Sequence, residues 1–327
     1  MGRVACIDVG TVTVRLAVCD VEGGRVRRMA KTSTICNLGE GLSATGRIGD
    51  AARARVLDCV DRYLANARQA AARVVCCTLT SAARDASNSA ELEGDLIARG
   101  LLPEVIAGRV EGSLTFLGVA QDFPDERILV ADNGGGSTEL AVGSLGERGL
   151  RLEAVTSVDV GCRRVTERFL PGDGPASDDQ VAAARAFCRG PFETAFEGEG
   201  LRDRASRLVV TGGTVTSLVA VRDSLAPYDP LRVHLRELGR DDVEALAARL
   251  AALSLGERAG LPGLQPKRAG VILGGALAVA ELMGVAGFER LTVSESDLLF
   301  GLAICAEAVR SGEESPLGWR PRLASLR

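Results

Sequence analysis

The chain has 327 residues, enough for roughly two domains with hydrophobic cores of their own. Its formal net charge is −4 and 25% of its residues are charged, which argues against a globally basic nucleic-acid binder and against a polyelectrolyte tail. Aromatic residues make up only 3%, so we expect no stacking platform for bases and a core of aliphatic side chains.

Strands and helices are predicted to alternate along the first part of the chain. Strands at residues 4–8, 15–19 and 25–31 should form an antiparallel start, with a turn at Glu22–Gly24 between the last two. The periodicity then predicts helices over 50–70, 89–99 and 111–121, and strands over 74–78 and 104–106. This alternation indicates an α/β architecture.

A second domain is predicted to begin near residue 125, where polarity rises before a new apolar strand. Strands are expected over 128–132, 139–143, 150–157 and 207–211, and helices over 178–187, 241–253, 270–283 and 297–309. The segments 171–175 and 226–230 are predicted to be loops, too short to separate further domains.

Cysteine usage indicates a reducing compartment. The nine cysteines are an odd number, contain no C-x-x-C pair and are predicted to be buried, reduced thiols. No signal-peptide core precedes Asp8, and the apolar run 271–280 is too short to span a bilayer. We therefore expect a cytoplasmic protein with no membrane partner.

The single histidine, His234, lies in a charged segment and is expected on the surface. Zinc centres, Ser-His-Asp triads and phosphohistidine relays all need imidazole, so they are not expected here. Any chemistry must come from carboxylates, hydroxyls, arginines and backbone amides.

An internal correspondence links the two predicted domains. Asp8-Val9-Gly10-Thr11 and Asp132-Asn133-Gly134-Gly135 each end an apolar strand and are followed, in the same register, by another apolar strand. Glycine lets backbone N–H groups point inward, and nearby hydroxyls add donors, which suits phosphate oxygens. The Asp at the base of each turn can take a hydrated divalent cation. One such turn would be an ordinary hairpin, but two in matched register favour phosphate binding.

This duplicated arrangement resembles the actin and hexokinase superfamily. Within it, six segments are similar in order and content to the exopolyphosphatase/guanosine-pentaphosphatase (Ppx/GppA) family: 7–11, 80–88, 107–111, 132–139, 211–214 and 291–294. The resemblance implies two actin-like (RNase H-like) α/β domains with a phosphate-binding cleft between them. They would span 1–124 and 125–296, with a C-terminal helical segment, about 297–327, packed back on the first domain.

The resemblance also implies residue roles. Glu111 matches the family's catalytic glutamate and Glu139 ends its D-x-G-G-G-S-T-E signature, so both are predicted to be catalytic. Asp132, Glu139 and Asp8 are predicted to hold Mg²⁺ or Mn²⁺, and K⁺ is a further candidate. The predicted phosphate contacts are Gly10, Thr11, Thr13, Arg84, Gly134, Gly135, Gly136, Ser137, Thr138, Gly212 and Gly213.

The residues alone leave plainer alternatives open for these positions. A carboxylate at position 111 would be favoured at the start of a helix by the helix dipole alone, and Arg84 could pair with Asp85 or with a neighbouring helix end. The segment 211–214 could be a tight strand-to-helix connection without a ligand. Three departures from the family pattern stand out: Val12 and Leu299 could weaken catalysis, whereas Asn133, together with Gly112, is a milder change.

The leading hypothesis is an exopolyphosphatase that removes the terminal phosphate of linear polyphosphate by metal-assisted attack of water. The alternatives are a guanosine pentaphosphate 5′-phosphohydrolase and a catalytically weak regulator that binds polyphosphate or a guanosine alarmone. A small-molecule kinase fits less well, because Glu111 matches a water-activating residue. The resemblance also leads us to expect a homodimer.

Overall fold

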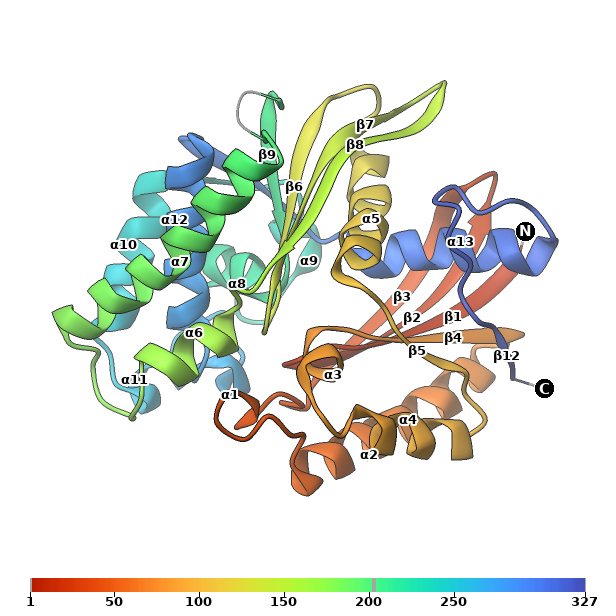
Figure 1. Ribbon diagram of the computed structural model, residues 1–327, viewed down its shortest axis with the longest axis horizontal. Coiled ribbons are helices and arrows are strands. Elements are labelled where there is room, and N and C mark those ends of the chain that lie inside the picture. Colours follow the sequence, from red (N-terminus) through yellow and green to blue (C-terminus); the bar gives the residue numbers. More distant parts are fainter. Residues whose placement is uncertain (1, 202–203, 327) are drawn as a thin grey trace. The chain divides into compact units, whose positions relative to one another are not determined.

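The computed structural model describes residues 2–201 and 204–326, and in it the chain divides into two compact units (Figure 1). The chain up to Gln121 and from Leu298 onward forms the first unit. Residues Asp122–Asp297 form the second. The chain therefore first passes from one unit to the other just before residue 125, where polarity rises in the sequence.

The sheet of the first unit joins an antiparallel meander to parallel strands. The meander consists of β1 (Gly2–Val9), β2 (Thr13–Glu22) and β3 (Arg25–Ile35). β1 also pairs in parallel with β4 (Val74–Leu79), which pairs in parallel with β5 (Pro103–Val105) and antiparallel with β12 (Ala324–Ser325). Val9, Leu79 and Val105 stand level at the carboxyl ends of β1, β4 and β5. The segments that follow these three strands therefore meet at one edge of the sheet.

Helices cover both faces of this sheet. On one face, Ile7 and Val9 share a buried cluster with Val56 and Val60 of α2 (Asp50–Gln69). On the other, α13 (Leu298–Ser311) contacts β1, β2, β3 and α5 (Gly108–Val119), as Figure 1 shows. The remaining helices are α1 (Leu42–Thr45), α3 (Ser81–Asp85), α4 (Ser89–Ala98) and the 3-10 turn η1 (Ala120–Asp122).

The second unit repeats the same strand order. β6 (Ile128–Asn133), β7 (Thr138–Gly146) and β8 (Gly149–Val158) form the meander, and β6 continues in parallel to β9 (Arg207–Thr211) and β11 (Arg290–Ser294). A short antiparallel strand, β10 (Glu237–Gly239), lies at the edge. Asp132, Thr211 and Ser294 stand level at the carboxyl ends of the parallel strands. Ligands of open α/β sheets usually bind at this edge.

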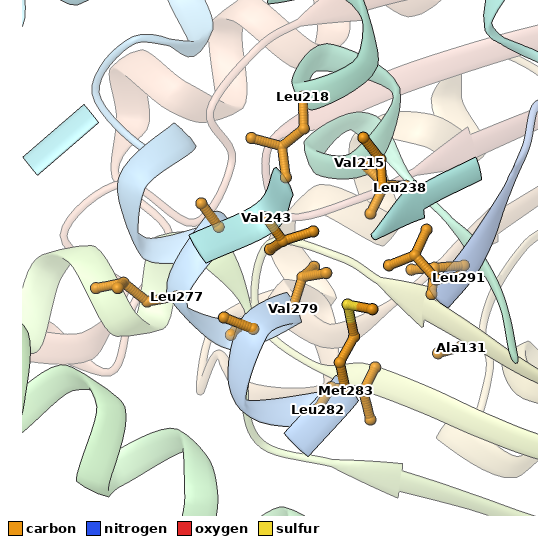
Figure 2. Packing of buried hydrophobic residues seen from close by; sticks show 14 of the residues in the cluster. Ala131, Val215, Leu218, Leu238, Val243, Leu277, Val279, Leu282, Met283 and Leu291 are labelled. Carbon is orange, nitrogen blue, oxygen red and sulfur yellow. The ribbon is translucent and has the colours of Figure 1, made fainter. Parts of the chain in front are cut away.

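The core of the second unit is built around α12 (Ile272–Ala286), which is apolar and buried on nearly every side. Figure 2 shows Leu277, Val279 and Met283 of this helix among side chains of α8, α10 and β11. The other helices are α6 (Cys162–Phe169), α7 (Asp178–Gly198), α8 (Gly213–Arg222), α9 (Pro230–Val233), α10 (Arg240–Ala251), α11 (Leu255–Ala259) and the 3-10 turn η2 (Pro266–Arg268).

Several predicted boundaries were wrong. α7 was predicted to end at residue 187 but continues through Pro191 to Gly198, because Phe192 and Phe196 are buried in the core and offset the cost of a proline inside a helix. Pro230, predicted to lie in a loop, begins α9, where Asp229 accepts a hydrogen bond from the Leu231 N–H at 3.0 Å. The helices predicted from 270 and 297 begin at 272 and 298, and α6 was not predicted.

The thiols match the prediction, because all nine cysteines are free and buried. Burial raises the pKa of Cys188 to about 12 and that of Cys305 to about 11, so both are neutral at physiological pH. Across residues 2–201 and 204–326, no helix has the length and apolar composition to cross a membrane.

His234, expected on the surface, is partly buried. Its side chain is only 27% exposed, and its Nδ1 accepts a hydrogen bond from the Glu295 N–H at 3.1 Å. Its Nε2 lies 3.7 Å from Asp122 Oδ2, and the same carboxylate oxygen accepts a hydrogen bond from Ser296 Oγ at 2.7 Å. The imidazole thus ties the segment after β11 to the start of the second unit.

Candidate active site

The first turn follows β1 and is closed by a hydrogen bond from the Gly10 N–H to the Thr13 carbonyl at 3.0 Å. Asp8 at its base is fully buried and stands opposite Arg15 on β2. Arg15 Nη2 and Nε lie 2.8 and 3.0 Å from Asp8 Oδ2. A carboxylate held this way has its charge largely balanced by the protein itself.

Glu111 and Arg84 form a partly buried ion pair beside this turn. Thr80 follows β4, and its N–H donates to the Val9 carbonyl at 3.2 Å, while α3, which carries Arg84, begins at the next residue. Glu111 lies in the first turn of α5, the helix after β5, and is only 7% exposed. Arg84 Nη1 donates to Glu111 Oε2 at 2.6 Å and to the Ile106 carbonyl at 3.0 Å. The arginine therefore orients the carboxylate.

The second turn carries an acidic pair at the place where the first carries Asp8 and Arg15. Asp132 and Glu139 are cross-strand partners on β6 and β7, so their side chains lie on the same face of the sheet. They are 5% and 2% exposed, and Ser157 Oγ donates to Glu139 Oε1 at 2.8 Å. Two buried carboxylates side by side repel each other, and a divalent cation relieves that repulsion.

The segment 211–214 approaches this acidic pair. Gly212 has φ +110°, which favours glycine, and a Cβ there would lie 2.7 Å from the Asn133 carbonyl oxygen and 3.3 Å from Asp132 Oδ1. The segment is a strand-to-helix connection, as one alternative predicted, because β9 ends at Thr211 and α8 begins at Gly213. It also lies beside the carboxylate of Asp132.

Arg268 is a neighbour of this site that sequence reasoning missed. A Cβ at Gly213 would meet Arg268 Nη1 at 2.2 Å, so the guanidinium lies directly against the start of α8. In the sequence Arg268 only appears as a charge before the apolar run 271–280, and nothing local links it to residues 212–213. A cation at a helix start adds to the positive field that attracts anions there.

The hydroxyl of Thr138, one of the predicted phosphate contacts, points into the interior of the second unit. Thr138 is fully buried, its hydroxyl donates to the Val160 carbonyl at 2.5 Å, and it accepts a hydrogen bond from Asn133 Nδ2 at 3.0 Å. Asn133 and Thr138 are cross-strand partners, next along the strands to the acidic pair and on the opposite face of the sheet. Asn133, one of the departures from the family pattern, is thus paired with an interior hydroxyl.

Replacing Asn133 with valine should stabilise the protein. Asn133 Oδ1 is buried without a hydrogen-bond partner, which costs about 1–3 kcal/mol, whereas the equivalent residue of the first turn is Val9. Since Thr138 keeps its bond to Val160, we expect Asn133→Val to raise the free energy of unfolding by about 1 kcal/mol and the melting temperature by about 2–4 °C. Differential scanning calorimetry measures this, and a lower melting temperature would show that Oδ1 holds a buried water or ion.

The other two departures occupy apolar positions in the first unit. Val12 is 5% exposed and Leu299, on α13, is fully buried. Gly301 has no room for a Cβ, which would lie 2.0 Å from the Leu114 carbonyl oxygen of α5.

The predicted site residues lie at the corresponding sheet edges of the two units. The first unit holds Asp8, Gly10, Thr11, Thr13, Arg84 and Glu111, and the second holds Asp132, Gly134, Gly135, Gly136, Ser137, Glu139, Gly212 and Gly213.

Comparison with known proteins decides the family. Residues 17–303 match the model of the Ppx/GppA phosphatase family. The chain belongs to this family. It is 36% identical to Exopolyphosphatase 2 of Mycobacterium tuberculosis over 319 residues, which cover 92% of this chain and 98% of the relative.

Solved structures support the same family assignment. The crystal structure of the Aquifex aeolicus Ppx/GppA family member matches with a TM-score of 0.77 at 26% identity, covering 95% of this chain and 99% of that one. An exopolyphosphatase from Cytophaga hutchinsonii matches with a TM-score of 0.81 at 25% identity, covering 96% and 99%. The predicted family and the predicted α/β fold are therefore confirmed.

Proposed function

We propose that this Ppx/GppA phosphatase is an exopolyphosphatase, which removes the terminal phosphate of linear polyphosphate by attack of water. The observation that carries the proposal is the duplicated turn, because each unit places backbone N–H groups at the carboxyl edge of its sheet, where they can bind phosphate oxygens. Similarity to Exopolyphosphatase 2 along nearly the whole chain supports polyphosphate as the substrate.

Glu111 is the proposed general base. Hydrolysis of a phosphoanhydride needs a positioned water, a group that takes its proton, and donors that stabilise the transferred phosphoryl oxygens. Arg84 fixes the Glu111 carboxylate through Oε2, so the base is held in place before substrate binds. Thr11, Gly135 and Gly136 are the proposed N–H donors to phosphate, whereas the Gly134 N–H closes the turn by donating to the Ser137 carbonyl at 3.0 Å.

The proposed cation site consists of Asp132 and Glu139. Mg²⁺ in phosphoryl-transfer sites typically takes one or two carboxylates together with substrate phosphates, and this acidic pair fits that donor set. Asp8 fits less well because Arg15 already neutralises it, so we confine the metal proposal to the second turn. When bound, Mg²⁺ or Mn²⁺ would neutralise charge on the phosphate oxygens. The buried free thiols support a reducing, cytoplasmic location.

Release of orthophosphate from three substrates tests the proposal. Medium-chain polyphosphate, guanosine pentaphosphate and ATP are compared, each with and without Mg²⁺. We expect metal-dependent release from polyphosphate in preference to the other two. Release from guanosine pentaphosphate alone would replace polyphosphate with the alarmone as substrate, and tight polyphosphate binding without release from any substrate would indicate a regulator.

A further inference from the structure

The carbonyl groups of Gly134, Gly135 and Gly136 in the second turn accept hydrogen bonds from the start of α6. The Cys162 N–H donates to the Gly134 carbonyl at 3.0 Å, and the N–H groups of Arg163 and Arg164 donate to the Gly135 carbonyl at 2.8 and 3.2 Å. The third carbonyl, that of Gly136, accepts from a side chain, Arg164 Nε, at 2.7 Å. One face of the turn is thereby fixed against α6.

This arrangement decides where the N–H groups of the turn point. A peptide group is planar and trans, so an N–H points away from the carbonyl of the preceding residue. Because the carbonyls of Gly134 and Gly135 face α6, the N–H groups of Gly135 and Gly136 face the other way. Neither N–H finds a hydrogen-bond acceptor in the part of the chain that the structure describes, which leaves both available to phosphate oxygens.

The first unit holds its turn in the same way with different residues. The Gly39 N–H donates to the Thr11 carbonyl at 2.9 Å, and the N–H groups of Cys36 and Asn37 donate to the Val12 carbonyl at 3.0 and 2.9 Å. Thr11 and Val12 are the positions equivalent to Gly135 and Gly136, counted from Asp8 and Asp132. In both units the supporting segment follows the third strand of the meander, so the support is part of the repeated design.

The hydrogen bonds that hold the two turns differ at one carbonyl group, and in the second unit that carbonyl is held by Arg164. Backbone N–H groups donate to the Val12 carbonyl, whereas a side chain donates to the equivalent carbonyl of Gly136. The second turn also has three consecutive glycines, which are free to adopt many conformations, while Val12 is stiff. A flexible turn needs outside support to keep its donors aimed, and aimed donors are what stabilises developing charge.

We propose that Arg164 is a positioning residue: by holding the Gly136 carbonyl it fixes the last part of the glycine turn, and so keeps the turn in the conformation that directs the N–H groups of Gly135 and Gly136 at substrate phosphate. The inference rests on the proposed function, because it assumes that this turn binds phosphate. Asp159 Oδ1 lies 3.5 Å from Arg164 Nη2 and helps to orient the guanidinium. Gly161 completes the support, because a Cβ there would lie 2.5 Å from the Gly135 carbonyl carbon and 2.6 Å from that of Gly136.

Steady-state kinetics of Arg164 variants test the proposal. Misplacement of reacting groups by about 1 Å can cost about 100-fold in rate, so we expect Arg164→Gln to lower kcat on polyphosphate at least tenfold and to weaken inhibition by inorganic phosphate. Arg164→Lys keeps one donor and should recover part of the loss. Arg168→Gln is the matched control, because Arg168 is on the same helix but lies over the rings of Phe169 and Phe187, and it should leave kcat unchanged.

A second variant moves the turn without changing charge. Gly161→Ala puts a methyl group against the backbone of the turn and should also lower kcat, while Gly190→Ala, where a Cβ meets nothing within 4 Å, should not. Melting temperatures show whether each variant is folded, and calorimetric titration with polyphosphate measures binding independently of turnover. Unchanged kcat and phosphate inhibition in both Arg164→Gln and Gly161→Ala would overturn the proposal. An inactive wild type that binds polyphosphate would refute the proposed function instead, and the same variants must then weaken that binding if Arg164 positions the turn.

Discussion

Glu111→Gln should reduce the rate of phosphate release from polyphosphate by about 10³-fold, because general-base catalysis is typically worth about 10²–10⁴-fold. Glutamine has nearly the same shape as glutamate and can still accept a hydrogen bond from Arg84, so the ordering of α3 and α5 should persist. It cannot take a proton from water. The Michaelis constant should therefore change little while kcat falls, since the turns that bind phosphate are intact.

Breaking an ion pair also costs stability, and a matched control separates that effect from chemistry. Glu281 on α12 is likewise buried and paired with arginines, at 2.9 Å to Arg185 Nη1 and 2.8 Å to Arg189 Nε. Glu281→Gln should lower the melting temperature without changing kcat, because Glu281 lies on a helix of the core. Activity of Glu111→Gln within tenfold of wild type, with the protein folded, would contradict its role as the base.

Local sequence patterns were sufficient to predict the two turns. Each is an apolar strand, an Asp, a glycine-containing turn and a second strand, and those features depend on nearest neighbours along the chain. The pairing of Arg84 with Glu111 could not be predicted, because it depends on three parallel strands ending at the same level. The role of α6 has the same origin, because the contacts of its first residues with the turn depend on how the helix packs in the core through Val165, and nothing local in the sequence links these residues to 134–136.

The inward direction of the Thr138 side chain could have been predicted from the sequence. Neighbouring residues of a strand point to opposite faces of a sheet, so a strand that directs Glu139 toward a ligand must direct Thr138 into the interior. The structure shows this arrangement, with Thr138 fully buried against Val160. The same alternation places Arg15 where the second unit has Glu139, a contrast visible in the sequence once the two turns are aligned from Asp8 and Asp132.

A second large loss of activity is expected on substitution of Glu139. Glu139→Gln removes one carboxylate of the acidic pair and leaves an amide that is a far weaker cation ligand. Loss of residues that merely support metal ligands costs about 10–100-fold in metal affinity or activity, so loss of a direct ligand should cost more than that. We expect kcat to fall by more than about 100-fold and the Mg²⁺ concentration for half-maximal activity to rise by at least about tenfold.

Thermal unfolding gives a readout that does not depend on activity. Because Asp132 and Glu139 are buried side by side, removing one charge should raise the melting temperature in EDTA above that of the wild type. Saturating Mg²⁺ should then stabilise the wild type, by about 2.7 kcal/mol at a concentration 100 times the dissociation constant, and should leave the variant nearly unchanged. Glu153→Gln, on β8 and paired with Arg127, is the control and should respond to Mg²⁺ as the wild type does. If Glu139→Gln were stabilised by Mg²⁺ as strongly as the wild type, the cation would have to bind elsewhere, and the acidic pair would have lost its proposed role.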